Sequence, residues 1–543
     1  MYLVGLDAGT TSISGVLLNV TTGTVERVVS VPHGADLPSQ DPETCLQDPE
    51  TIRETLETVL RKLVDETPDA GSVLAIGVTG QVHGILYLDG AGAALSPLYT
   101  WQDLRGRRVR PGEDLSSRTT WTDWAHARSG YRVPSGYGLL THCINMHDGL
   151  VPPRAEHITT ILGYLTMRLT GATWARIDST DAHALGLFAF DRNGFDLDAA
   201  RELGIAVRLL PDVVAAATTL GSTSDGIPVI VGLGDNQAAI IGSVLDAEKS
   251  ILINVGTSSQ LSMICPDALG TPASNLEMRP FPGNGHLLSG AALCGGSAVA
   301  MLERLFREVC RRYGDVDPGP LFDRMASLDL DGLPRELIPA VQTQFLGTRE
   351  DPDARGSISG LGPENLSPDF LIAGFLYGIA GELARFRSAL PAPLRERSTR
   401  IVGVGNGLRK NSLLRRILAS ELELPVVLPK SAEEAALGAA IAAGVATGVY
   451  EDYLSDHRPI HFSPYRRFPN ETHRRAAPGR RYSAHARRPD HDPDVRPDRR
   501  ATPHSSRGRR RIPSRPHGRL HRRASRDRRH DVVDPRRRAH SGR

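Results

Sequence analysis

Short apolar runs alternate with longer amphipathic stretches along the first 465 residues. The apolar runs end in glycine or polar residues and predict strands at 3–6, 14–19, 74–78, 229–234, 251–255 and 400–404. Stretches with apolar residues at three- and four-residue spacing predict helices over 49–65, 155–169, 367–390 and 433–446. Strands that alternate with helices are typical of mixed α/β layers.

The first predicted strand runs directly into Asp7-Ala-Gly9-Thr10-Thr11. A strand would hold the aspartate rigidly, and a glycine lets backbone amides approach phosphate oxygens. The threonine hydroxyls can donate hydrogen bonds to the same oxygens. The motif indicates a site for a metal-bound triphosphate; for this single motif, an ordinary hairpin turn is the alternative.

A second copy of the motif favours the phosphate interpretation. The segment from Ile251 again reads as an apolar strand, a polar residue (Asn254) and the turn Gly256-Thr257-Ser258. Two such turns predict a duplicated domain whose halves face each other across a cleft. Asp7 is matched by Asn254, so only the first half keeps the anionic oxygen that magnesium prefers.

At 543 residues the chain exceeds one compact core. We predict an N-terminal domain over 1–245, a C-terminal domain over 246–465 and a tail over 466–543. No apolar run approaches the length of a membrane span, and the first residues do not resemble a signal peptide. The five scattered cysteines form no C-x-x-C pair, which favours a reducing, cytoplasmic setting.

The near-neutral net charge hides a strong asymmetry. Residues 466–543 carry 26 arginines, no lysine and 8 acidic residues, a net charge of +18 against −16 for the rest. This composition cannot bury a core, so we expect a disordered tail. Its arginines would suit a nucleic-acid or polyanion arm, or the tail is an out-of-frame extension; we do not expect nucleic acid as a partner.

Three further carboxylates are candidates for chemistry. Asp235 follows an apolar strand, where it could act as the general base that accepts a proton from an attacking hydroxyl. It could equally cap the helix that begins with Asn-Gln-Ala-Ala. Asp178 and Asp181 could bind substrate hydroxyls or be turn residues.

Two polar clusters predict a pocket that binds several adjacent hydroxyl groups of a ligand. Gln81 and His83 alternate in a glycine-flanked turn after a strand, and Trp101 and Asp103 form a second cluster. An aromatic wall with amide, imidazole and carboxylate groups suits a polyhydroxy ligand. A structural role for the Trp and the His is the alternative.

A glycine-rich strand-to-helix turn contains Gly405, Asn406 and Gly407 and is followed by Asn411. It is similar to a nucleotide-binding loop, but it lacks the spacing of the P-loop and of the dinucleotide fingerprint.

Together these motifs resemble the FGGY carbohydrate kinases of the actin-like ATPase superfamily over residues 1–465. The resemblance implies two ribonuclease H-like domains that flank a catalytic cleft, with ATP and Mg²⁺ as cofactors. It places phosphate binding on Asp7, Gly9, Thr10, Thr11, Gly256, Thr257 and Ser258, metal binding on Asp7, and adenosine binding on Gly405, Asn406, Gly407 and Asn411. It makes Asp235 the catalytic base and a substrate contact.

The resemblance also bears on the substrate. Within the family, Gln81-Val82-His83 is similar to the substrate loop of ketose kinases, with Trp101 and Asp103 alongside. The segment from Thr100 and the glycine-rich turn resemble sedoheptulokinases, whereas Asp178-Ser-Thr-Asp181 is closer to the pentulose pattern. We therefore expect phosphorylation of sedoheptulose, or of D-xylulose as the alternative.

The expected partners are a small ketose and MgATP, and no membrane; a homodimer is one candidate assembly. A non-catalytic regulator that binds sugar and ATP is a different class that shares this architecture. An intact Asp235 and a filled substrate loop favour the enzyme.

Overall fold

The computed structural model describes residues 1–65, 67, 72–111, 119–265, 272–273, 275–283, 285–348, 351, 353–454 and 460–462. The chain divides into two units, Met1–Glu471 and Thr472–Arg543. The description concerns the first unit. The arginine-rich segment 466–543 lies outside the described residues, so its disorder stays a prediction.

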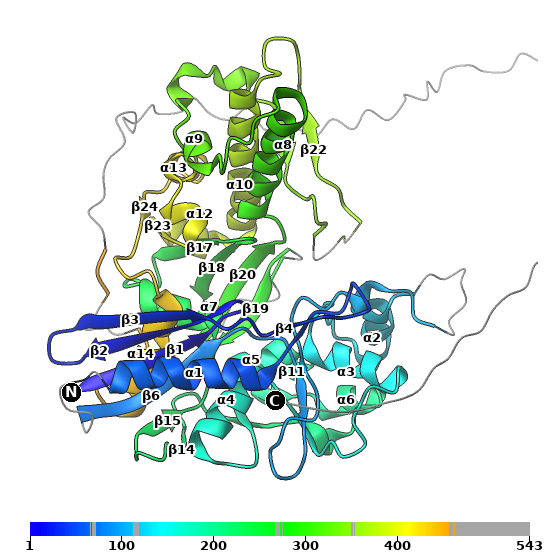
Figure 1. Cartoon of the computed structure of the whole chain (residues 1–543), viewed down its shortest axis with the longest axis vertical. Helices are drawn as coiled ribbons and strands as arrows, with labels where there is room; N and C mark the ends of the chain where they lie inside the picture. The colour runs from blue at the N-terminus through cyan, green and yellow to red at the C-terminus, as the bar shows by residue number, and fades with distance from the viewer. Residues whose placement is uncertain are drawn as a thin grey trace, which may run out of the picture. The chain divides into compact units, whose positions relative to one another are not determined.

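The first sheet is built around the strand that carries Asp7 (Figure 1). Its order is β3 (Thr24–Pro32), β2 (Ser12–Asn19), β1 (Tyr2–Ala8), β6 (Val73–Gly80), β15 (Pro228–Ile230) and β14 (Thr219–Ser222), and β16 (Leu233–Gly234) also pairs with β6. β3, β2 and β1 are antiparallel neighbours, whereas β6 runs parallel to both β1 and β15.

The second sheet repeats this order and these directions. It runs β20 (Gly285–Ala292), β18 (Ser259–Cys265), β17 (Ser250–Val255), β23 (Arg400–Val404) and β24 (Val426–Val427), with β19 (Glu277–Phe281) added beyond β20. β20, β18 and β17 are antiparallel neighbours, and β17, β23 and β24 are parallel. The predicted duplication of a ribonuclease H-like α/β domain is therefore confirmed.

Two helices cover opposite faces of the first sheet. α1 (Pro49–Val64) packs on β2, where a Cβ on Gly15 would come within 2.7 Å of Val59 and Leu63 side chains. Gly15 pairs with Leu6, so the adjacent Gly5 faces the other way. On that other face, a Cβ on Gly5 would lie 1.8 Å from the carbonyl oxygen of Ala436 in α14 (Glu434–Ala446).

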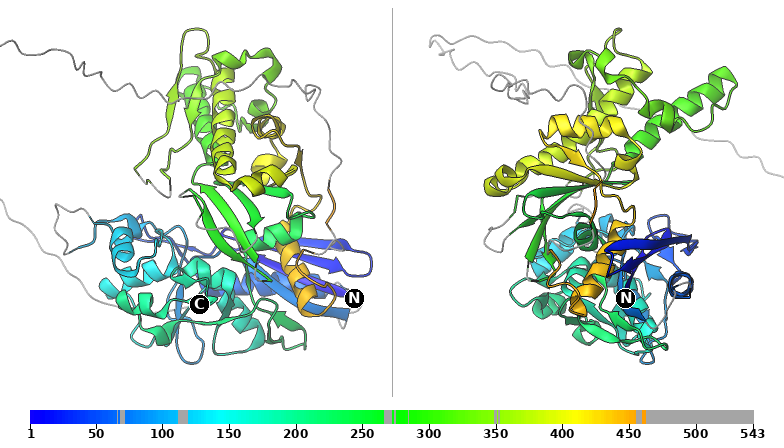
Figure 2. Two further views of the ribbon diagram at one scale, coloured as in Figure 1. Left: turned by 180° about the vertical axis from the view of Figure 1, so that it is seen from behind. Right: turned by 90° about the vertical axis from the view of Figure 1, so that its left-hand side faces the viewer.

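α14 comes from the end of the described chain, yet it packs against β1, β6 and α7 (Asp235–Ser243) of the first half (Figure 2, orange). The contact with α7 is also backbone to backbone, since a Cβ on Gly438 would lie 1.9 Å from the oxygen of Ala238. The Ala- and Gly-rich composition of this helix is thus explained by close packing. The boundary at 245/246 stays a prediction.

The segment between β6 and β14, residues 81–218, forms an insertion with its own apolar core. Its helices are α2 (Trp121–Ser129), α3 (Gly138–His147), α4 (Ile161–Thr170), α5 (Ser179–Leu185) and α6 (Leu197–Glu202). Its short strands are β7 (Leu86–Leu88), β8 (Leu98–Tyr99), β9 (His157–Thr159), β10 (Arg176–Asp178), β11 (Phe188–Ala189), β12 (Gly194–Phe195) and β13 (Asp212–Val214).

The helix predicted over 155–169 is wrong at its beginning. Residues His157–Thr159 form β9, which pairs with β7, and α4 begins only at Ile161. The hydroxyl of Thr160 accepts a hydrogen bond from the amide of Gly163, so this residue caps the helix. The strand predicted over 229–234 is likewise two strands, β15 and β16.

The second half contains two long helices, α8 (Gly296–Gly314) and α10 (Pro368–Ala389). The single-turn α12 (Asn406–Arg409) and α13 (Ser412–Glu421) follow β23. The remaining short elements are β4 (Asp36–Leu37), β5 (Leu46–Gln47), α9 (Phe322–Ala326), β21 (Ala340–Gln342), β22 (Ser357–Ser359) and α11 (Ala392–Arg397). Among the described residues, no helix is long and apolar enough to cross a membrane.

Candidate active site

The first predicted phosphate turn connects β1 to β2. The amide of Gly9 donates to the carbonyl of Ser12 at 3.0 Å, which closes the turn. Asp7 stands one residue before the end of β1, in register with Ser14 and Thr79 on the neighbouring strands. The pairing on both sides holds its backbone in place.

The second predicted turn, Gly256-Thr257-Ser258, connects β17 to β18 at the equivalent place, and its three residues are exposed. The start of α8 packs directly on it. The amides of Gly295 and Gly296 donate to the carbonyls of Thr257 and Gly256 at 2.9 and 2.8 Å. These bonds hold the turn in place while its three residues stay exposed.

The glycine-rich turn after β23 lies beside the second turn, because β17 and β23 pair with Asn254 opposite Val404. Gly405 has φ +83°, and a Cβ there would lie 2.4 Å from Oδ1 of Asn254. Only glycine fits this position. Asn411 caps α13 through a 3.0 Å bond from the amide of Leu414, so it has a structural role whatever its part in adenosine binding.

Asp235 is the first residue of α7, and it is exposed. The residues before it are fixed on both sides: Thr79 donates to the carbonyl of Leu233 at 2.6 Å, and the amide of Gly234 donates to the hydroxyl of Thr180 at 2.9 Å. Gly234 pairs with Gly80 of β6, the neighbour of Gln81. The carboxylate therefore projects from a rigid backbone.

The pKa values of Asp7 and Asp235 are both raised above the ordinary value of an aspartate. Burial raises the pKa of Asp7 to about 7, with repulsion by Asp235, Glu433 and Glu434 adding to the effect. Surrounding protein atoms also raise the pKa of Asp235, opposed by a hydrogen bond from the amide of Asn236 and by the charge of Arg279. A base with a raised pKa accepts a proton more readily near neutral pH.

The chemistry of these donors fits a magnesium ion brought in with a nucleotide. Within the described residues, no group of three or more His, Cys, Asp or Glu side chains is arranged to hold a metal by itself. Magnesium in nucleotide sites needs only one or two carboxylates beside phosphates and water. A divalent cation would also relieve the repulsion between Asp7 and Asp235.

Gln81 and Trp101 both lie at the first phosphate turn. The amide of Gln81 donates to the carbonyl of Ala8 at 2.9 Å, and its side chain donates to Gln47 at 2.8 Å. Gln47 in turn donates to the carbonyl of Thr10 at 2.7 Å. The indole of Trp101, 40% exposed, donates to the hydroxyl of Thr10 at 3.1 Å. Residues of the predicted substrate loop and of the predicted first phosphate turn therefore form one hydrogen-bond network.

His83 lies farther along, in the insertion. Its Nδ1 donates to the carbonyl of Ala184 at 2.7 Å, which fixes the tautomer, and its ring stacks on Tyr137 at 4.2 Å. His83 has φ +76°, an uncommon conformation for a residue other than glycine. Tyr137 was not predicted, because no motif surrounds it.

The carboxylate of Asp103 forms an ion pair with Arg105. Its two carboxylate oxygens accept hydrogen bonds from the guanidinium of Arg105 at 2.7–3.1 Å, and both side chains are buried. Arg105 also donates to Asn145 at 3.0 Å. This buried ion pair supports the loop that carries Trp101, and a sugar contact by Asp103 stays a prediction.

Asp178 and Asp181 are completely buried and lie behind the start of α7. Asp178 caps α5 and accepts a hydrogen bond from Thr180 at 2.6 Å, while Asp181 accepts one from Thr160 at 2.5 Å. Burial raises their pKa values to about 6 and about 8. A bound sugar cannot reach them in this conformation, so the structure favours the structural interpretation over direct hydroxyl binding.

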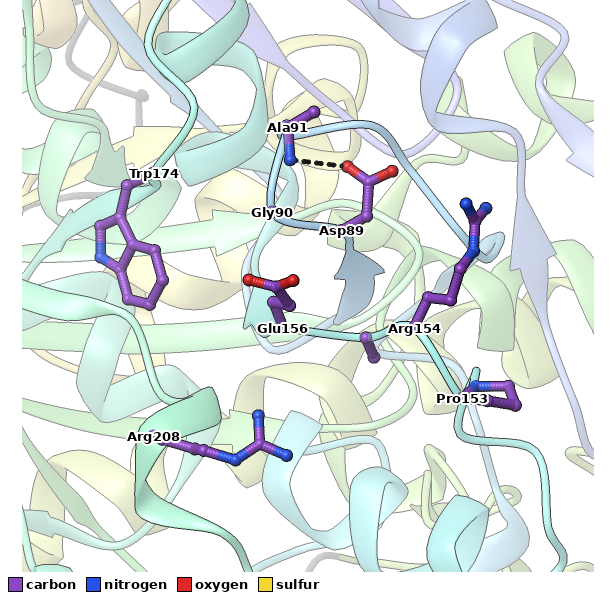
Figure 3. A pocket seen from close by; sticks show the side chains of 9 residues that line it. Asp89, Gly90, Ala91, Pro153, Arg154, Glu156, Trp174 and Arg208 are labelled. Atoms are coloured by element: carbon purple, nitrogen blue, oxygen red, sulfur yellow. Dashed lines mark hydrogen bonds between the residues drawn. The ribbon is translucent and has the colours of Figure 1, made fainter.

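A separate open pocket of about 800 Å³ lies on the insertion (Figure 3). Its polar lining includes Asp89, Arg154, Glu156 and Arg208, with Trp174 on one side. None of the predicted site residues lines it, so it has no part in the site described above.

Two matching glycine-hydroxyl turns on a duplicated α/β fold, with a carboxylate at a helix start whose charge acts on Asp7, fit an ATP-dependent sugar kinase of the actin-like ATPase fold. The family comparison agrees. The model of the FGGY family of carbohydrate kinases, N-terminal domain, matches residues 2–242, and that of the C-terminal domain matches residues 251–447. The chain belongs to the FGGY family of carbohydrate kinases.

The similar proteins include kinases of different ketoses. The chain is 25% identical to the sedoheptulokinase of Mus musculus over 464 residues, 78% of this chain and 93% of that protein. It is 28% identical to the xylulose kinase of Streptomyces rubiginosus over 301 residues, 51% of this chain and 58% of that one. The crystal structure of xylulose kinase from Rhodospirillum rubrum superposes with a TM-score of 0.71 at 22% identity, covering 86% and 93% of the two chains.

Proposed function

We propose that this kinase transfers the γ-phosphoryl group of MgATP to the terminal hydroxyl of a ketose, with sedoheptulose as the preferred substrate. The observation that carries the proposal is the position of Asp235. It is an exposed carboxylate on a doubly fixed backbone, next to the substrate loop and within the electrostatic field of Asp7.

Each group has a distinct task in the proposed reaction. The sugar lies against Gln81, His83 and Trp101 and presents its terminal hydroxyl to Asp235. The carboxylate accepts the hydroxyl proton as the oxygen attacks the γ-phosphorus, and ADP leaves with the bridging oxygen. The turns at Gly9 and Gly256 bind the phosphates. Magnesium, bound with Asp7, would neutralise charge that develops on the phosphate oxygens.

The choice of sedoheptulose rests on similarity over length and on the substrate loop. The likeness to the mouse sedoheptulokinase spans 93% of that protein, whereas the likeness to the Streptomyces xylulose kinase spans 58% of its length. The Thr100-Trp101-Gln102-Asp103 segment also resembles the heptulose enzymes. D-Xylulose is the second candidate, because the crystal structure cited above and the Streptomyces relative are both named as xylulose kinases.

The proposed base is tested with Asp235→Asn in the full chain. General base catalysis contributes about 10²–10⁴-fold, so kcat should fall by that factor while ATP and sugar binding persist. Asp246→Asn is the matched control, since Asp246 forms a surface ion pair with Lys249 at 3.4 Å. Near-normal turnover of the Asp235 variant would remove this residue from the mechanism.

A further inference from the structure

β19 joins the second half of the chain to the insertion and to the helix that carries Asp235. At one end of β19, the hydroxyl of Tyr137 donates to Oε1 of Glu277 at 2.5 Å. At the other end, Nε2 of Gln237 donates to the carbonyl of Pro280 at 2.9 Å. Both bonds connect residues more than 40 positions apart in the sequence.

Glu277 also forms an ion pair with Arg279 of the same strand. Nη2 and Nε of Arg279 donate to Oε2 of Glu277 at 2.6 and 2.9 Å. The two residues share one face of β19, because they are two positions apart in a strand. Only 9% of the Arg279 side chain is exposed, so the guanidinium is held in a single orientation by its carboxylate.

The pair bridges two groups already placed in the proposed sugar site. Tyr137, which binds Glu277, is the residue that stacks on His83. On the other side, the charge of Arg279 acts on Asp235 and lowers the pKa of that carboxylate against the effect of the surrounding protein atoms. The contacts thus run from His83 through Tyr137, Glu277 and Arg279 towards Asp235.

We propose that Glu277 and Arg279 form a sugar-binding wall contributed by the second half of the chain, in which the carboxylate accepts from and the guanidinium donates to hydroxyls of the ketose. This inference rests on the proposed function, which places the ketose between His83 and Asp235. A carboxylate beside a guanidinium offers acceptors and donors at fixed spacing, which suits neighbouring hydroxyls.

The proposed sugar-binding wall lies in the same sheet as the predicted second phosphate turn. β19 pairs with β20, β20 with β18, and β18 with β17, the strand that leads into the Gly256 turn. The sheet that carries the second phosphate turn therefore also carries the proposed sugar contacts. Discrimination between ketoses is then determined partly by residues outside the insertion.

The experiment uses Glu277→Gln and Arg279→Lys in the full chain. Each change keeps the size of the side chain but removes the acceptor charge or the planar fork. With the ketose that the wild type turns over fastest among sedoheptulose, D-xylulose and D-ribulose, we expect the sugar KM to rise at least tenfold. The ATP KM should stay within twofold, and the kcat/KM ratios between the sugars should shift at least fivefold.

Glu421→Gln and Arg335→Lys are the matched controls, because this exposed pair, at 3.1 Å, belongs to the same half of the chain. Unchanged sugar KM values and unchanged sugar ratios in both test variants would overturn the inference. So would equal increases of the ATP and sugar KM accompanied by a lower Tm, which would indicate a purely structural pair.

Failure of the proposed function gives a different pattern. A wild-type enzyme that turns over none of the three ketoses refutes the ketose proposal and, with it, the wall. Full activity of Asp235→Asn refutes the base alone, since the sugar KM comparison is made on variants that retain Asp235.

Discussion

The hydroxyl of Thr180 should be a positioning group for Asp235, and Thr180→Val tests it. The hydroxyl accepts from the amide of Gly234 at 2.9 Å and donates to Asp178 at 2.6 Å. Thr180 is 3% exposed and Asp178 is fully buried, so water cannot replace the lost group. Valine keeps the shape of the side chain and leaves the amide that precedes Asp235 without its partner.

The magnitude follows from this burial. Leaving a buried polar group unpaired costs about 1–3 kcal/mol, so we expect the free energy of unfolding to fall by about 2 kcal/mol. A displacement of the reacting group by 1 Å can lower turnover by about 100-fold. We expect kcat to fall by that order, with the ATP KM almost unchanged, because the nucleotide turns are on other strands.

A coupled ADP-release assay gives kcat and KM, and urea denaturation gives the free energy of unfolding. Thr180→Ser should restore most of the turnover, because it restores the hydroxyl. Thr166→Val is the control, since this buried threonine bonds only to carbonyls within α4 at 3.0 and 3.3 Å. If the Thr180 and Thr166 valine variants have the same kcat, the positioning argument is refuted.

Three other predictions follow from packing, backbone conformation and burial. Gly438→Val should lower the free energy of unfolding by about 3 kcal/mol in urea denaturation, because its Cβ would lie 1.9 Å from a backbone oxygen of α7; an unchanged midpoint would contradict this packing. Gly405→Ala should raise the Kd for ATP at least tenfold in calorimetry, since φ is +83° and Asn254 is 2.4 Å from the new atom; unchanged affinity would separate the turn from the nucleotide site. The folded-state pKa of Asp181 is raised from 3.8 to about 8, so the native state retains a proton that the unfolded state has lost. The free energy of unfolding of the wild type should therefore fall relative to Asp181→Asn as the pH rises from 4 to 8, by about 1.4 kcal/mol per pH unit at most; parallel curves would contradict the burial argument.

The duplicated fold was predictable because its evidence is local. Each phosphate turn is a strand followed by glycine and hydroxyl residues, and each half contains one. The position of Asp235 at a strand end could be recognised in the same way. The alternative that Asp235 caps the helix is wrong, because Gly234 is the capping residue and Asp235 is the first helical one.

Other features depend on contacts between distant segments, which no local pattern records. Tyr137, the residue that precedes α3, and Arg279 in β19 approach the site, and nothing around either in the sequence indicates a ligand site. α14 packs on the first sheet although it follows the second along the chain.

We propose that the chain is a ketose kinase whose preferred substrate is sedoheptulose. The most direct measurement is ADP release by the full chain with MgATP and sedoheptulose, D-xylulose, D-ribulose or glycerol. We expect a kcat/KM for sedoheptulose at least tenfold above the others, equivalent to about 1.4 kcal/mol of transition-state stabilisation. A preference for D-xylulose would favour the second candidate. Turnover of glycerol alone, or no sugar-dependent ADP release, would contradict the account.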